Sequence, residues 1–202
     1  YAEAFYKPVG PGPKTQQKFP AGSTNVFAGN LRVSQSFDTI VNAFEKLKEI
    51  KINLIVLGEG RDKTRIQKVI KEKKLEQRFY FLGSYPPDDM SKYFACADAL
   101  LITLKKAEIF SYTLPGKLQS YLACGKPIVG ALDGIGKKII EESNSGFCTD
   151  AENSTELSKL FLKLSRLPKE NIDKFSKNAL SYFKDNFAKD KLLLDLENIF
   201  NA

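Results

Sequence analysis

Residues 25–60 read NVFAGNLRVSQSFDTIVNAFEKLKEIKINLIVLGEG, and this stretch decides the fold. An apolar run at residues 26–28 ends at a glycine, and the apolar side chains of residues 37–47 then recur at the spacing of one helical face. A second apolar run, Ile52–Leu57, ends at another glycine. This order predicts a strand, a helix and a second strand. Because the runs are continuous rather than alternating, we expect a parallel sheet covered on both faces.

The same alternation of strand, turn and helix continues to about residue 150. Further strands are predicted at residues 79–82, 99–102 and 128–131 and around Phe147. Helices are predicted after residue 60, at residues 88–95 and 117–123, and from near Lys137. The sequence therefore predicts an α/β fold, a doubly wound, Rossmann-like parallel sheet of about six strands.

The two ends of the chain differ from this central region. The first 24 residues contain seven Pro or Gly residues, a density typical of an extended connector. From about residue 155 the strands stop, and three groups of apolar residues at helical spacing predict three helices, with a break at Pro168. We therefore divide the chain into a linker at 1–24, one α/β domain at 25–167 and additional helices at 168–202.

Composition excludes several classes of protein. The 202 residues are 43% hydrophobic and 27% charged, values typical of a globular domain and not of a disordered chain. The chain contains no His, so it has neither a Ser-His-Asp triad nor a Cys-His pair of its own. Its three Cys residues form no Cys-x-x-Cys motif, which is typical of buried thiols in a reducing compartment.

The formal net charge of +7 is unevenly distributed. Residues 61–78 carry eight basic and three acidic side chains, around apolar residues at helical spacing. This pattern favours the solvated outer face of an amphipathic helix, with attraction to an anionic membrane surface as the alternative. No aromatic residues interleave with the basic ones, so nucleic acid is not expected as a partner.

Ligands of parallel α/β sheets bind beyond the carboxyl ends of the strands, and that edge is rich in glycine here. Glycines allow a ligand to approach the backbone, and helix starts favour phosphate groups, so the edge predicts an anionic, nucleotide-type ligand. A dinucleotide fingerprint is not met, because Lys63 stands where the third glycine is needed. The residues at this edge include Gly29, Asn30, Arg32, Gly58, Gly60, Gly83, Ser84 and Tyr85.

The most specific stretch is residues 108–129, EIFSYTLPGKLQSYLACGKPIV. Pro115 is suited to the start of the helix predicted at residues 117–123, and Gly125 is suited to its end. Lys117 lies in the first turn, where a cation is unfavourable beside the positive end of the helix dipole. A bound anion would account for this cation.

At these residues the sequence resembles the nucleotide-sugar glycosyltransferases of the GT-B fold, family 4. That family shows P-x-K-x-x-E-Y-x-A-x-G-K-P, which residues 115–127 follow closely. The resemblance extends through the phrases AGN at 28–30, LGEG at 57–60, FLG at 81–83 and ADA at 97–99, and covers residues 25–167. Among family members, the chain looks most similar to bacterial enzymes that build surface polysaccharides.

The resemblance implies a retaining, metal-independent transfer from a nucleotide-diphosphate sugar, with a UDP-sugar favoured, to a glycan or lipid-linked acceptor. It implies no cofactor besides this donor substrate, and a cytoplasmic location, with peripheral association at the inner face of the membrane. Residues 25–167 would bind the nucleotide sugar, 1–24 would lead from an acceptor domain outside this chain, and 168–202 would pack back toward it. We expect the isolated chain to bind nucleotide without transferring sugar.

The resemblance also implies roles for individual residues. The catalytic candidates are Arg32, Lys117 and Glu108, and no residue is assigned to a metal. The candidates for contact with the donor are Gly29, Asn30, Gly58, Gly60, Gly83, Ser84, Tyr85, Ser111, Gly116, Gln119 and Ser120.

The sequence departs from the family at two places. Ser120 stands where the second carboxylate of the family's Glu-x7-Glu pair grips the ribose, and Tyr112 stands where the first belongs. Glu108 is a candidate for the first carboxylate, while Gln119 or Ser120 would offer neutral hydrogen bonds. The Lys usual in the family's first helix is also not evident, since residues 34–36 are Ser-Gln-Ser.

Two other functions remain open at this point. Half of a nucleotide-sugar epimerase of the same fold would need acid–base residues, including His, which the chain lacks. A non-catalytic binding module would use the same sheet edge for a nucleotide or for a protein partner. If it served only protein partners, it would bind no nucleotide.

Overall fold

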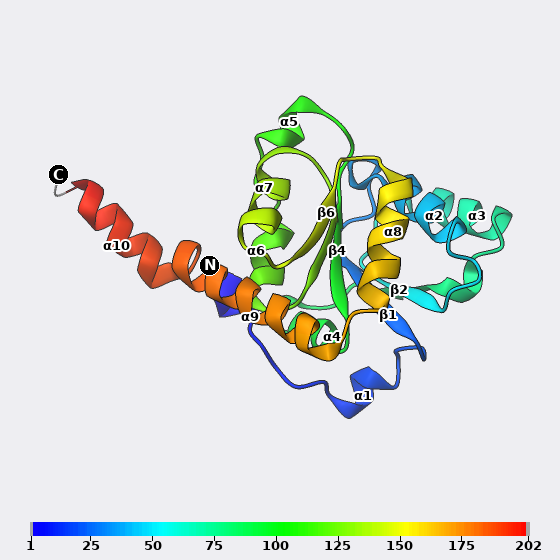
Figure 1. The fold of residues 1–202 in the computed structure, drawn as a ribbon, viewed down its shortest axis with the longest axis horizontal. Coiled ribbons are helices and arrows are strands. Elements are labelled where there is room, and N and C mark those ends of the chain that lie inside the picture. The colour runs from blue at the N-terminus through cyan, green and yellow to red at the C-terminus, as the bar shows by residue number, and fades with distance from the viewer. Residues whose placement is uncertain (1, 201–202) are drawn as a thin grey trace.

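The computed structural model describes residues 2–200 and contains one parallel sheet of six strands (Figure 1). The spatial order is β3-β2-β1-β4-β5-β6, so the chain reverses its direction of winding between β1 and β4. This is the strand order of a Rossmann-like sheet, as the sequence predicted. The strands are β1 (Ser23–Ala28), β2 (Ile52–Leu57), β3 (Phe79–Gly83), β4 (Ala99–Thr103), β5 (Ile128–Ala131) and β6 (Gly146–Thr149).

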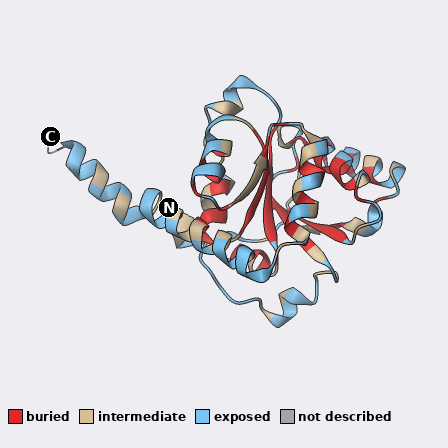
Figure 2. Ribbon diagram, in the orientation of Figure 1, coloured by how far each residue is buried: buried red, intermediate tan, exposed pale blue. Residues whose placement is uncertain are grey.

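Helices cover both faces of the sheet. The helices of the domain are α2 (Phe37–Glu45), α3 (Lys63–Glu72), α4 (Pro87–Ala95), α6 (Gly116–Ala123), α7 (Gly134–Glu142), α8 (Ser154–Ser165) and α9 (Lys169–Asn186). Alternate residues of β1 enter two separate cores: Val26 packs with α4, α6, α7 and α9, and Phe27 packs with α2, α3 and α8. The strands in Figure 2 are accordingly buried along most of their length.

Most strand boundaries agree with the sequence-based prediction, and β2 and β5 match it at both ends. β1 begins at Ser23, three residues before the apolar run, because the N–H of Thr24 donates to the Asp98 carboxylate at 2.8 Å and Ser23 already pairs with β2. α7 begins at Gly134 rather than near Lys137. The loop expected at residues 103–116 contains one helical turn, α5 (Glu108–Ser111).

The two ends of the chain flank the sheet on the α4 and α6 side. The N-terminal segment carries the short helices η1 (Ala2–Ala4) and α1 (Pro13–Gln16), and it packs against α6 through η1 and against α4 through α1. The helix α9 packs against α6, whereas α10 (Lys189–Phe200) buries no residue and extends away from the domain (Figures 1 and 2). Within residues 2–200, no helix combines the length and apolar character needed to span a membrane.

Candidate functional site

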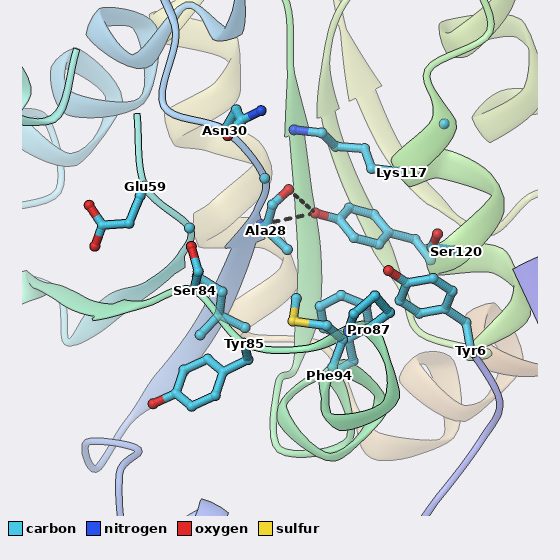
Figure 3. Close-up of a pocket in the computed structure, with 16 residues that line it drawn as sticks. Tyr6, Ala28, Asn30, Glu59, Ser84, Tyr85, Pro87, Phe94, Lys117 and Ser120 are labelled. Carbon is cyan, nitrogen blue, oxygen red and sulfur yellow. Dashed lines mark hydrogen bonds between the residues drawn. The ribbon is translucent and has the colours of Figure 1, made fainter. Parts of the chain in front are cut away.

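A cavity of about 450 Å³ lies beyond the carboxyl ends of β1 and β2, next to the start of α6 (Figure 3). This is the side of the sheet where the winding reverses, the usual ligand position in open α/β folds. It is lined by Tyr6, Ala28, Gly29, Asn30, Leu57, Gly58, Glu59, Ser84, Tyr85, Pro87, Met90, Phe94, Gly116, Lys117, Ser120 and Tyr121.

The loops that form one rim of the cavity are hydrogen-bonded to each other. The Gly29 N–H donates to the Leu57 carbonyl at 2.9 Å, and the Gly58 N–H donates to the Gly83 carbonyl at 2.8 Å. Gly58 has a φ of +142°, and a Cβ atom there would lie 2.1 Å from the Gly29 carbonyl oxygen. A Cβ at Gly60 would lie 2.1 Å from the Leu31 carbonyl oxygen. The absence of a side chain at Gly58 and Gly60 therefore allows the neighbouring loops to pack closely, in addition to any contact of these glycines with a ligand.

Lys117 is the cation of the cavity. Figure 3 shows its ammonium directed toward the loop that carries Asn30. The Lys117 Nζ donates a hydrogen bond to Gln35 Oε1 and lies 4.2 Å from the centroid of the Phe27 ring. Within residues 2–200, no carboxylate oxygen lies within 4.0 Å of it. Burial lowers the pKa of Lys117 to about 7, because the charged form loses solvation without gaining a counter-charge.

The start of α6 adds a second preference for an anion. No side chain caps this end of the helix, and its first turn contains no acidic residue. Gly116 and Lys117, the first two residues of α6, line the cavity, so the positive end of the helix dipole lies at its rim. Gly116 has no atom within 4 Å of its Cβ position. A diphosphate at this point would accept hydrogen bonds from the helix start and pair with the Lys117 ammonium.

Tyr121 positions this helix against the sheet. Its buried hydroxyl accepts from the Ala28 N–H at 3.1 Å and lies 3.3 Å from the Leu101 carbonyl, which accepts from it. Burial raises the pKa of this phenol, so the hydroxyl stays protonated. Tyr121 is four residues after Lys117 and shares its helix face, so it fixes the lysine relative to the end of β1. Tyr121 was not predicted as a site residue, although its spacing of four residues from Lys117 can be read from the sequence.

The structure brings eight of the predicted site residues together in this cavity. Arg32 instead lines a neighbouring hollow of about 480 Å³ with Val33, Arg61 and Asp62. Glu108 is exposed at the start of α5, and the Ser111 carbonyl packs against the start of α7. Gly60, Gly83 and Gln119 line neither hollow. The eight residues in the cavity are Gly29, Asn30, Gly58, Ser84, Tyr85, Gly116, Lys117 and Ser120.

Several residues of the cavity were not predicted. Glu59 is one, and its carboxylate lies 2.7 Å from the Lys63 ammonium. Tyr6 and Phe94 are two others, and their rings stack with centroids 6.1 Å apart and planes 12° apart. Among residues 2–200, no group of three or more His, Cys, Asp or Glu side chains is placed to hold a metal ion.

Comparison of the sequence with known proteins identifies relatives of this chain. Residues 14–181 match the family model described as Glycosyl transferases group 1. Among curated proteins, N-acetyl-alpha-D-glucosaminyl L-malate synthase of Bacillus anthracis is 24% identical over 177 residues, covering 87% of this chain and 44% of that protein. The O-antigen biosynthesis glycosyltransferase WclY of Escherichia coli is 24% identical over 189 residues, which cover 92% of this chain and 49% of that protein. The chain thus spans about half the length of these curated relatives.

Solved structures show the same fold. Anabaena HepE in complex with UDP and glucose superposes with a TM-score of 0.80 at 17% identity, over 100% of this chain and 55% of that chain. The C-terminal domain of a glycosyl transferase group 1 family protein, LpcC, from Francisella tularensis gives a TM-score of 0.74 at 16% identity. The match covers 93% of this chain and 98% of that domain. The second comparison shows that a C-terminal domain of this kind has nearly the same extent as this chain.

Proposed function

The chain belongs to the Glycosyl transferases group 1 family, and from that premise we propose that it is the donor-binding part of a retaining, metal-independent glycosyltransferase. It would bind a UDP-sugar and serve transfer of the sugar to a glycan or lipid-linked acceptor in surface-polysaccharide synthesis. One observation carries the proposal: the Lys117 ammonium lies in a cavity at a helix start, with no carboxylate within 4.0 Å among the described residues.

The proposed chemistry is electrostatic. When the bond to the sugar breaks, negative charge develops on the departing diphosphate. The Lys117 ammonium, the N–H groups at the start of α6 and the backbone at Gly29 would stabilise that charge from fixed positions. Arg32, two residues beyond Asn30, would add a second positive charge from the neighbouring hollow. Glu108 remains a candidate that would have to reach the site from the exposed α5.

The choice of UDP rests on the relatives. HepE has been solved with UDP, and the Staphylococcus aureus protein TarM has been solved in complex with UDP. In this chain, Ser84 and Tyr85 at the end of β3 would border the base. The curated relatives named for O-antigen and colanic acid biosynthesis support a polysaccharide acceptor.

A second domain would hold that acceptor. The relatives are about twice as long as the part that this chain matches. Three apolar side chains of α10, Leu194, Ile199 and Phe200, are more than half exposed, which supports packing of this helix against such a domain. The reaction would take place in the cytoplasm, at the inner face of the membrane.

Nucleotide binding tests the proposal directly. Thermal unfolding would be measured with UDP, GDP, ADP and dTDP, each at about 100 times its expected dissociation constant, where binding adds about 2.7 kcal/mol. We expect UDP to raise the melting temperature most. A module that serves only protein partners predicts no shift with any of the four, and that result would refute the proposal.

A further inference from the structure

Tyr6 enters the cavity from a segment outside residues 14–181, the part that matches the family. The backbone on both sides of Tyr6 is attached to α4. The Lys7 N–H donates to Ser91 Oγ at 3.2 Å, and the same hydroxyl donates to the Phe5 carbonyl at 3.3 Å. Ser91 is buried, so this pair of hydrogen bonds holds the segment at a fixed place on the domain.

The ring of Tyr6 is held by a row of aromatic side chains. It stacks on Phe94, and Phe94 meets the Tyr121 ring edge to face, with centroids 5.4 Å apart. Tyr121 is in turn hydrogen-bonded to the end of β1 at Ala28. The phenol of Tyr6 therefore has a defined position relative to Lys117, which lies on the same helix as Tyr121.

The hydroxyl of Tyr6 has no hydrogen-bond partner in the part of the chain that the structure describes. Figure 3 shows it directed into the cavity, and it makes no hydrogen bond with any residue between 2 and 200. The side-chain hydroxyl of Ser120, which lines the same cavity, is also without a partner in this part of the chain. A phenol and an alcohol are neutral groups that both donate and accept hydrogen bonds, so they suit the hydroxyls of a sugar ring.

We propose that Tyr6 forms a further hydroxyl-binding contact for the nucleotide sugar, beside Ser120, which stands at the position that the resemblance assigns to the ribose. The inference rests on the proposed function, because it assumes that the diphosphate occupies the Lys117 end of the cavity. Lys117 would then hold the anionic group, while Tyr6 holds a neutral hydroxyl of the same ligand. That hydroxyl belongs either to the ribose or to the transferred sugar.

Calorimetric titration of the wild-type chain and of Tyr6→Phe with UDP, 2′,3′-dideoxy-UDP and UDP-glucose tests the inference. The substitution keeps the ring and its stacking on Phe94 but removes the hydroxyl. We expect a loss of affinity of about 3- to 10-fold, the effect of one neutral hydrogen bond. Tyr80→Phe is the matched control, since the Tyr80 hydroxyl donates to the Gln77 carbonyl outside the cavity.

The three ligands separate the two sources of the hydroxyl. A loss for UDP that vanishes for the dideoxy ligand assigns Tyr6 to the ribose, and a loss for UDP-glucose alone assigns it to the transferred sugar. If Tyr6→Phe binds all three as tightly as the wild type, the inference is overturned while UDP binding stands. If the wild type binds none of them, the proposed function fails, and the inference fails with it.

Discussion

Lys117 and Asn25 both lack the partners usual for their side chains, and they differ in what lies beside them. Lys117 borders the cavity, and no carboxylate of the described residues lies within 4.0 Å of it. Asn25 lies in the middle of β1, fully buried, and neither its amide nitrogen nor its amide oxygen has a partner among residues 2–200. The lysine has room for a ligand next to it, whereas the asparagine is enclosed by the sheet and its helices. An unpartnered polar group therefore indicates a binding site only where space for a ligand adjoins it.

The largest effect, a loss of folding stability, is expected at Gly58, in one of the loops that form the rim of the cavity. Gly58→Ala would put a Cβ atom 2.1 Å from the Gly29 carbonyl, at a φ of +142°. We expect the free energy of unfolding to fall by more than about 3 kcal/mol, measured by urea denaturation.

Gly116→Ala is the control for this change, because nothing lies within 4 Å of its Cβ position. It should alter the free energy of unfolding by less than about 1 kcal/mol. Equal effects of the two substitutions would contradict the packing of the loops described above.

The next largest effect concerns the lysine. Lys117→Met removes the ammonium and keeps most of the side-chain volume. We expect the affinity for UDP-glucose in calorimetry to fall roughly 10- to 100-fold, the range for a hydrogen bond to a charged group. Lys68→Met on the exposed face of α3 is the control and should leave the affinity unchanged. A loss of affinity in both variants would point to net charge rather than to the cavity.

The same variant should be more stable than the wild type, in a manner that depends on pH. The folded-state pKa of Lys117 is lowered to about 7, so between pH 7 and about 10 the unfolded state binds more protons than the folded state. The stability of the wild type therefore rises across this window relative to that of Lys117→Met. Urea denaturation at pH 6.5 and 9 would show the advantage of the variant shrinking with pH, and an advantage that grew would contradict the burial of the charged amine.

A smaller effect is expected at the asparagine. Asn25→Val replaces the enclosed amide by an apolar side chain suited to a strand. The free energy of unfolding should rise by about 1 to 2 kcal/mol, because no buried polar group is left without a partner. UDP-glucose affinity should stay as in the wild type. If Asn25→Val weakened binding, the contrast between the two side chains would be lost.

Strands such as β2 and β5 could be predicted from local signals because glycine and proline residues flank them. β2 stops before Gly58, and β5 starts after Pro127, so both were placed at their observed bounds. The edge at which ligands bind followed from the parallel order of the strands. The sequence places Asn25 directly before the apolar run of the first strand. No local sequence pattern shows that its buried amide lacks a hydrogen-bond partner.

The details of the site depend on contacts that no local pattern records. Tyr6 lies in a segment predicted as a linker, and its place on α4 depends on hydrogen bonds between residues more than 80 positions apart. Arg32 and Lys117 were expected to lie near the same edge, yet the loop after Gly29 turns Arg32 into a separate hollow. That turn is fixed by the hydrogen bond from the Leu31 N–H to the Glu59 carbonyl, at 2.9 Å.

Proton uptake on binding tests the central claim, that the Lys117 amine pairs with a diphosphate. UDP-glucose would be titrated at pH 8 in two buffers of different ionisation enthalpy, since its two phosphates do not titrate near this pH. With a pKa of about 7 the free amine is mostly neutral, and pairing with the anion would protonate it. We expect the wild type to take up most of one proton per ligand and Lys117→Met to take up none. Tight binding of the wild type with equal heats in both buffers, together with an unchanged affinity of Lys117→Met, would contradict the account.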